Sequence, residues 1–204
     1  MSIISIILII NDIQITRGEL KEKEIIVEKI KNEEMELRSI EKTLKMAYSL
    51  NRFESRYYAY IFKDLSEEEN IPWQLIAAVI WIESKYDPSA TSIANCKGLM
   101  QLKDKTAKEV CESVNVRYYG NIVWNDIMNI VLGSHYLASD YHKKGLEWAL
   151  KKYVGGPKIK KAGESKRYEN WYKGRVKGEY IKLKYIHKGI ILENKQINKG
   201  DNDG

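Results

Sequence analysis

An apolar run from Ile71 to Ile82 that ends at Glu83 is the feature of this sequence that most restricts its fold. If the run is helical, Glu83 continues the stripe of Ile76 and Ile80, because residues three or four positions apart share a helix face. The carboxyl would then be buried, and burial disfavours its charged form and raises its pKa. A general acid near neutral pH has these properties. The alternative is a glutamate at a frayed helix end that points into water, since carboxylates are rarely buried.

Prolines mark both ends of this segment. Pro72 suits the first turn of a helix, where its fixed φ is useful and its missing N–H costs nothing. Pro88 is expected to end the helix at Asp87, because the residue before a proline avoids the α region. Asp87 lies four residues from Glu83, but we interpret it as a loop cap. This part of the sequence therefore supplies one well-placed carboxylate, Glu83.

Short motifs follow Glu83 in a fixed order, and their combination is far more specific than any one of them. They are Glu83-Ser84, then Gly98-Leu99-Met100-Gln101, then Asn129-Ile130 with Gly133, Tyr136 and Leu137, then Ala149 to Gly156, then Glu164-Ser165 with Tyr168. This arrangement resembles the catalytic domain of the soluble lytic transglycosylases, relatives of goose-type lysozyme. The resemblance implies a mainly α, lysozyme-like helical catalytic domain.

The resemblance also implies a reaction with one acid/base and with neither a metal nor an organic cofactor. Glu83 would protonate the β-1,4 glycosidic oxygen between N-acetylmuramic acid and N-acetylglucosamine. The same residue would then remove a proton from the muramoyl 6-hydroxyl, which closes a 1,6-anhydro ring. The alternatives are a hydrolytic, lysozyme-like muramidase and a wall-binding or structural module without the reaction.

Substrate-binding roles come from the same resemblance, for residues that taken alone would be read as turn or core residues. Gln101 would hydrogen-bond the sugar or its acetamido group, and Met100 would form an apolar wall of the cleft. Gly98 would let the backbone turn beside the sugar, since glycine tolerates φ > 0.

Two tyrosines and a serine complete the expected site. Tyr153 would lie close to Glu83 and position the acid or the substrate, and Tyr168 would line the opposite side of the groove. Ser84 would either hydrogen-bond the acid or serve as a helix-end residue. The chain departs from the family at Val154, where an amide side chain is usual.

Four segments differ in composition. Residues 1–16 are apolar but shorter than the roughly 20 residues that span a bilayer, so they are expected to anchor, to direct export or to pack on a partner. Residues 17–64 are expected to form a long amphipathic helical extension. By the resemblance, residues 65–177 are expected to form the lysozyme-like domain, and residues 178–204 are expected to form a basic extension and tail.

Within the basic extension, apolar and aromatic residues around Lys188-Gly189 suggest a small β-hairpin. The end of the chain from Asn194 is expected to be a disordered tail.

Charge is concentrated toward the C-terminus of this chain, whose formal net charge is +6. Residues 151–188 hold 13 Lys and Arg against three Glu, which is +10 and leaves about −4 for the rest. A basic face suits the anionic cell wall, and peptidoglycan glycan strands are the expected partner. Nucleic-acid binding is less favoured, because basic and aromatic residues interleave there without a known nucleic-acid motif.

These expectations place the protein outside the cytoplasm, facing the cell wall, either anchored to a membrane or part of a phage particle. Residues 1–50 are the expected contact with a membrane, a virion or a secretion complex.

Cysteines and histidines carry little functional information here. Cys96 and Cys111 leave open both a disulfide and two unrelated thiols. His135, His142 and His187 lack the spacing of metal ligands, so we expect no metal site and interpret them as surface or hydrogen-bonded residues.

Overall fold

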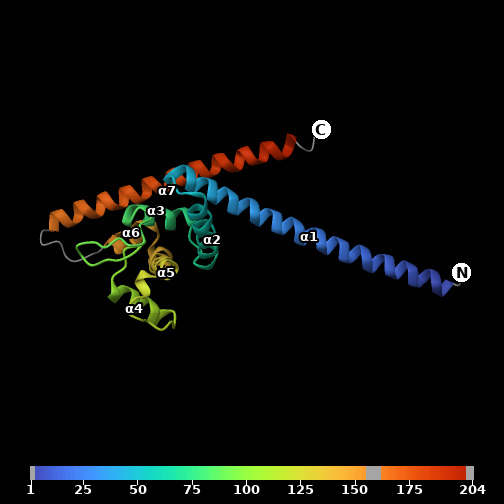
Figure 1. Ribbon diagram of the computed structural model, residues 1–204, viewed down its shortest axis with the longest axis horizontal. Coiled ribbons are helices and arrows are strands. Elements are labelled where there is room, and N and C mark those ends of the chain that lie inside the picture. The colour runs from blue at the N-terminus through green and yellow to red at the C-terminus, as the bar shows by residue number, and fades with distance from the viewer. Residues whose placement is uncertain (1–2, 155–161, 201–204) are drawn as a thin grey trace.

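The computed structural model describes residues 3–154 and 162–200, which are mostly helical (Figure 1). Short helices form a compact body, and the two long helices α1 and α7 cross beside it and extend past it (Figure 1). The elements are α1 Ile3–Tyr48, α2 Arg52–Glu68, α3 Trp73–Glu83, α4 Asp104–Ser113, the 3-10 helix η1 Ile122–Trp124, α5 Asp126–Lys144, α6 Leu146–Val154 and α7 Ala162–Gly200. The predicted mainly α fold is confirmed.

The predicted hairpin around Lys188-Gly189 is wrong, because α7 runs through this segment as one helix. Val176, Leu183 and Ile190 are buried, and residues spaced by seven lie on one face of a helix. A strand would instead bury alternate residues. The apolar residues of this segment therefore follow a helical period, not the strand period expected from the sequence.

The C-terminal part of α7 also changes the expected boundaries. The helix crosses the limit expected between residues 177 and 178 and reaches Gly200. The prediction of a disordered tail from Asn194 is therefore wrong as far as Gly200, and residues 201–204 lie outside the described part of the chain. Asn194 Nδ2 donates a hydrogen bond to Ser39 Oγ at 3.3 Å. This contact joins the end of α7 to α1.

The expected amphipathic extension forms α1 and α2, with a break between them. Ser49 adopts the left-handed region with φ 57°. Asn51 then caps α2 by accepting hydrogen bonds from the backbone of Phe53 and Glu54, and Glu54 accepts one from the Asn51 backbone. This reciprocal arrangement satisfies N–H groups that a helix start leaves unpaired, and it fixes where the chain turns.

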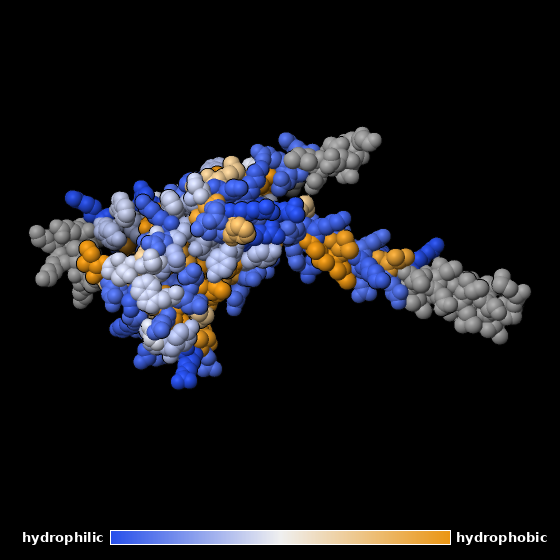
Figure 2. All heavy atoms as spheres, viewed as in Figure 1, coloured by the Kyte–Doolittle hydropathy of each residue, from blue (hydrophilic) through white to orange (hydrophobic). Residues whose placement is uncertain are grey.

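The C-terminal part of α1, from Leu37 onward, belongs to the core of the body. Leu37, Ile40 and Leu44 are buried together with residues of α3 and α7. The N-terminal part of α1 projects away from the body (Figure 1), and apolar side chains such as Val27 and Ile30 are exposed along α1 before the core contacts begin (Figure 2). No helix among the described residues is long and apolar enough to cross a membrane.

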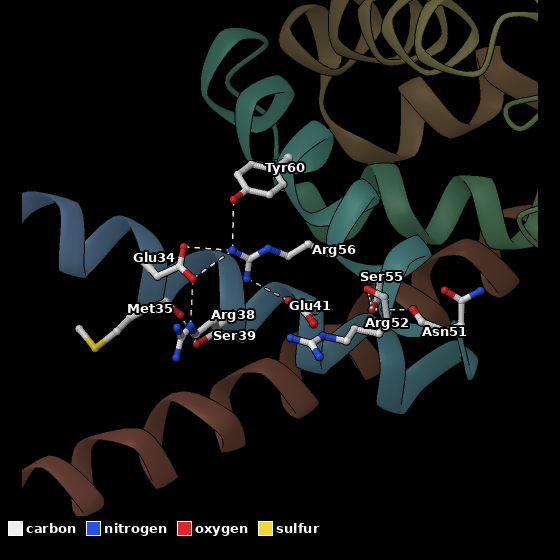
Figure 3. A network of polar contacts seen from close by, with 10 residues as sticks. All are labelled: Glu34, Met35, Arg38, Ser39, Glu41, Asn51, Arg52, Ser55, Arg56 and Tyr60. Atoms are coloured by element: carbon white, nitrogen blue, oxygen red, sulfur yellow. Dashed lines mark hydrogen bonds and ion pairs between the residues drawn. The ribbon is translucent and has the colours of Figure 1, made fainter.

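A network of charges fixes α1 against α2 (Figure 3). Arg56 of α2 contacts both carboxylate oxygens of Glu34, at 3.0 and 3.1 Å, and also contacts Glu41 at 3.1 Å. Tyr60 accepts a further hydrogen bond from the same guanidinium. Both glutamates lie on α1, so one side chain of α2 ties two turns of α1 to the body, in addition to the apolar contacts of Leu37, Ile40 and Leu44.

The apolar run forms α3, the central helix of the body. Its residues Leu75 to Ile80 are all buried, and Pro72 precedes the first helical residue as predicted. The helix ends at Glu83, four residues earlier than the Asp87 end that Pro88 suggested. Lys85 and Tyr86 adopt the left-handed region and turn the chain before the proline is reached. Glu83 therefore lies at the helix terminus.

Candidate active site

Glu83 ends α3 where that helix packs on α7. Tyr172 of α7 donates a hydrogen bond from its hydroxyl to Glu83 Oε1 at 2.5 Å. Burial raises the pKa of Glu83 to about 7, although the hydrogen bond from Tyr172 opposes the rise. Glu83 still keeps part of its surface accessible to solvent. The raised pKa agrees with the expectation, the side chain is partly rather than fully buried, and near neutral pH the carboxyl can both give and take a proton.

Three tyrosines lie within electrostatic range of Glu83. Burial raises the pKa of Tyr153, Tyr168 and Tyr172, and the charge of Glu83 raises each further. All three hydroxyls therefore keep their protons at neutral pH and can act as hydrogen-bond donors. Tyr153 was expected to lie close to Glu83, and the effect of the Glu83 charge on the pKa of Tyr153 agrees with that expectation.

The turn from Gly98 to Gln101 is tied to the end of α3 and to α6. Ser84 Oγ donates to Leu99 O at 2.8 Å and lies 3.2 Å from Ile80 O. Tyr153 of α6 donates from its hydroxyl to Met100 O at 2.8 Å. Of the two roles expected for Ser84, the structure places it at the helix end, where it holds the turn beside the acid.

Asn129 of α5 supports the same turn from inside the body. Its side chain is buried, and its Nδ2 donates to Lys97 O at 2.9 Å and to Val123 O at 2.8 Å. Its Oδ1 accepts from Met100 N at 2.7 Å. Gly98 has φ +74°, as expected for a turn, and a Cβ there would lie 2.5 Å from Asn129 Nδ2. The turn therefore requires glycine for both its backbone angle and its space.

Met100 and Gln101 were expected to line the substrate cleft, but their side chains contact other parts of the protein. Met100 is fully buried, and a Cβ on Gly133 would lie 2.5 Å from its Sδ. Its side chain lies in the core rather than on a surface open to a ligand. Gln101 Nε2 donates to Ala90 O at 3.0 Å and to Gly98 O at 2.9 Å. This nitrogen holds the loop, and the contact of Gln101 with a sugar stays a prediction.

Asp87 supplies no second acid. Its Oδ1 accepts from Ser89 N at 2.8 Å and from Ser89 Oγ at 2.7 Å, and these bonds lower the pKa of Asp87. The interpretation of Asp87 as a loop cap is confirmed. Burial raises the pKa of Glu83 and the hydrogen bond from Tyr172 lowers it, and Asp87 contributes to neither effect.

Cysteines and histidines lie apart from this chemistry. Cys96 and Cys111 are both free thiols. Each of the three histidines has a hydrogen-bond partner, as expected: Glu69 for His135 and His142, and Thr43 for His187. Across the part of the chain that the structure describes, no group of three or more potential ligands is placed to hold a metal ion.

Sequence reasoning missed the roles of Tyr172 and Asn129. Tyr172 lies four residues after Tyr168 and four before Val176, which is the spacing of one helix face. That spacing could have indicated that Tyr172 points into the body with Val176. Asn129 was noticed only as part of a motif, although an asparagine in an apolar helix face needs hydrogen-bond partners when it is buried.

The fold and the site define a helical domain with a single acid of raised pKa. The chain belongs to the transglycosylase SLT domain family, whose model matches residues 60–174. This confirms the resemblance seen in the sequence motifs.

Individual relatives are matched over limited lengths. A membrane-bound lytic murein transglycosylase F from Desulfosudis oleivorans is 37% identical over 100 residues, which are 46% of this chain and 20% of that protein. The protein of the same name from Alcanivorax borkumensis is 40% identical over 53 residues, 26% of this chain and 11% of that protein. The solved 70 kDa soluble lytic transglycosylase SLT70 from Escherichia coli is 19% identical with a TM-score of 0.46, covering 68% of this chain and 24% of that one. This chain thus matches a quarter or less of each.

Proposed function

We propose that this chain cleaves the glycan strands of peptidoglycan as a lytic transglycosylase. The observation that carries the proposal is the Glu83 carboxyl, whose pKa is raised to about 7 by burial and which Tyr172 holds by one oxygen. A group with this pKa serves as acid and as base near neutral pH. Membership of the transglycosylase SLT family and the relatives named for murein support the class of substrate.

The reaction begins with Glu83 in its protonated form. The carboxyl gives its proton to the β-1,4 glycosidic oxygen while the bond from the muramoyl C1 to that oxygen breaks. The N-acetylglucosamine portion leaves with a new hydroxyl, and Glu83 becomes a carboxylate. The muramoyl 6-hydroxyl then attacks C1, and its proton passes to Glu83. The products are one free hydroxyl and one 1,6-anhydro ring, and Glu83 is protonated again.

A single acid suits this route better than hydrolysis by two carboxylates. An inverting or retaining hydrolase needs a second carboxylate as base or nucleophile. Asp87, four residues away in sequence, is exposed and bonded to Ser89. The substrate hydroxyl takes the place of the activated water, and one residue is then sufficient.

Other parts of the chain bear on where the enzyme works. A peptidoglycan substrate places it outside the cytoplasmic membrane, and the lysines and arginines of α7 suit an anionic wall. Residues 37–48 of α1 take part in the core. A membrane, virion or secretion-complex partner would therefore contact the projecting part of α1 before Leu37, where apolar side chains are exposed.

Mass spectrometry of muropeptides tests the proposal. Purified sacculi are digested with the protein, with the Glu83→Gln variant as the matched control. We expect anhydro ends from the native protein and no product from the variant. Reducing ends would instead identify a muramidase, and binding without any product would identify a wall-binding module. Excess nucleic acid at near-physiological salt should leave the cleavage largely intact.

A further inference from the structure

Two large aromatic side chains lie exposed and stacked on α7, close to the acid. The rings of Tyr168 and Trp171 have centroids 5.6 Å apart with 22° between their planes. Tyr168 is 48% exposed and Trp171 is 52% exposed. The Arg175 guanidinium lies 5.8 Å from the centroid of the Trp171 ring. Because the two rings are stacked and each is about half exposed, together they present one apolar surface that a ligand can cover.

These side chains border the face of α7 that reaches Glu83. Tyr168, Trp171 and Arg175 follow the i, i+3, i+7 spacing of one helix stripe. Tyr168 and Tyr172 are four residues apart, so Tyr168 also adjoins the inner stripe whose Tyr172 hydroxyl holds Glu83. The charge of Glu83 contributes to the raised pKa of Tyr168. The exposed stripe therefore starts beside the acid and leads away from it along the helix surface.

The chemistry of the stripe suits a sugar ring. A pyranose presents C–H groups on its flat face and hydroxyls at its rim. The apolar face of an aromatic ring can stack on the C–H groups of the sugar. The sugar hydroxyls at the rim then stay in contact with water. The Arg175 guanidinium lies within cation–π range of the indole and favours its present orientation, which reduces the ordering that a ligand must impose.

We infer that Tyr168 and Trp171 form a stacking platform for a sugar of the glycan strand next to the bond that Glu83 cleaves. This inference rests on the proposed function and adds Trp171 as a binding residue. Trp171 acts through affinity for the strand, since its ring makes no hydrogen bond to the acid and is not part of the buried core.

A binding measurement without turnover tests the platform. In the Glu83→Gln background, purified uncrosslinked glycan strands are titrated onto the protein and onto its Trp171→Ala form. We expect the dissociation constant to rise about tenfold in Trp171→Ala, and by less in Trp171→Phe, which keeps a ring. The matched control is Tyr185→Ala. Tyr185 is 73% exposed on the same helix, roughly 21 Å further along its axis, and its removal should leave the affinity unchanged.

Kinetics in the active protein separate the two proposals. Trp171→Ala should raise KM for sacculi while kcat stays near that of the native protein. If the native protein cleaves sacculi but Trp171→Ala binds glycan strands with unchanged affinity, the platform is refuted and the transglycosylase assignment stands. If the Glu83→Gln protein binds no glycan strand and the native protein yields no product, both proposals are refuted.

Discussion

The hydroxyl of Tyr172 donates to Glu83 Oε1 across 89 residues of sequence, and this contact joins the end of α3 to α7. Because the pKa of Tyr172 is raised well above its usual value, by burial and then by the charge of Glu83, the hydroxyl stays a donor at neutral pH. A donor on Oε1 leaves the transferable proton on Oε2. The pair therefore fixes which oxygen of the acid serves the substrate.

Removal of this donor should change the pH dependence of activity. In Tyr172→Phe the hydrogen bond that lowers the pKa of Glu83 is lost, so its pKa should rise above about 7. The protonated acid then persists to higher pH, and the alkaline limb of kcat/KM moves upward. The rate should also fall by roughly one to two orders of magnitude, as expected for one lost hydrogen bond in the transition state. A pH profile that matches the native one would contradict this role, and Tyr185→Phe is the control.

Glu83 should make the stability of the protein depend on pH. Its pKa in the folded state, about 7, exceeds its ordinary value of 4.5. Below pH 4.5 the carboxyl is neutral in both states, and as pH rises toward 7 the unfolded state ionises first. The free energy of unfolding therefore falls over this range, by at most about 3 kcal/mol.

The Glu83→Gln variant provides the comparison, because it keeps the shape and has no ionisation. We expect it to gain stability over the native protein as pH rises from 4 to 8, as measured by denaturant unfolding at each pH. Parallel curves for the two proteins would show that burial does not perturb this carboxyl.

Gly98→Ala should destabilise the turn beside the acid. The added Cβ meets Asn129 Nδ2 and Val123 O at 2.5 and 2.8 Å, and φ is +74°. We expect a loss of roughly 1 to 3 kcal/mol in the free energy of unfolding, with lower activity because the Met100 backbone shifts. Gly174→Ala is the matched control, since nothing lies within 4 Å of its Cβ position in α7. That change should stabilise the protein slightly, by about 0.5 to 1 kcal/mol.

Arg56→Met should loosen α1 from the body. Arg56 neutralises Glu34 and Glu41 together, and its side chain is 33% exposed, so the network is worth more than an isolated surface pair. We expect a loss of about 1 kcal/mol that shrinks at high salt. Lys105→Met removes the exposed pair with Glu109, at 3.8 Å, and should have almost no effect. Equal losses from the two variants would show that the network does not fix α1.

The sequence by itself determined the features that depend on neighbours along the chain. The apolar run after Pro72 predicted α3, and the position of Glu83 at the end of the run predicted a buried carboxyl with a raised pKa. The family resemblance predicted a turn at Gly98, which the freedom of glycine to adopt φ > 0 allows. Each of these follows from local periodicity or from the backbone freedom of one residue, which tertiary packing did not override.

Only the tertiary structure decided how the acid is held. Tyr172 reaches Glu83 from 89 residues away, and Asn129 reaches Met100 N from 29 residues away. It also decided that residues 178–200 continue α7, because Val176 and Leu183 pack in the core with residues of α1 and α3, and Ile190 is buried on the same face of the helix. A strand and a helix can both accommodate such a short apolar pattern when it is read alone. The choice between them depends on the partner surface, which local sequence does not encode.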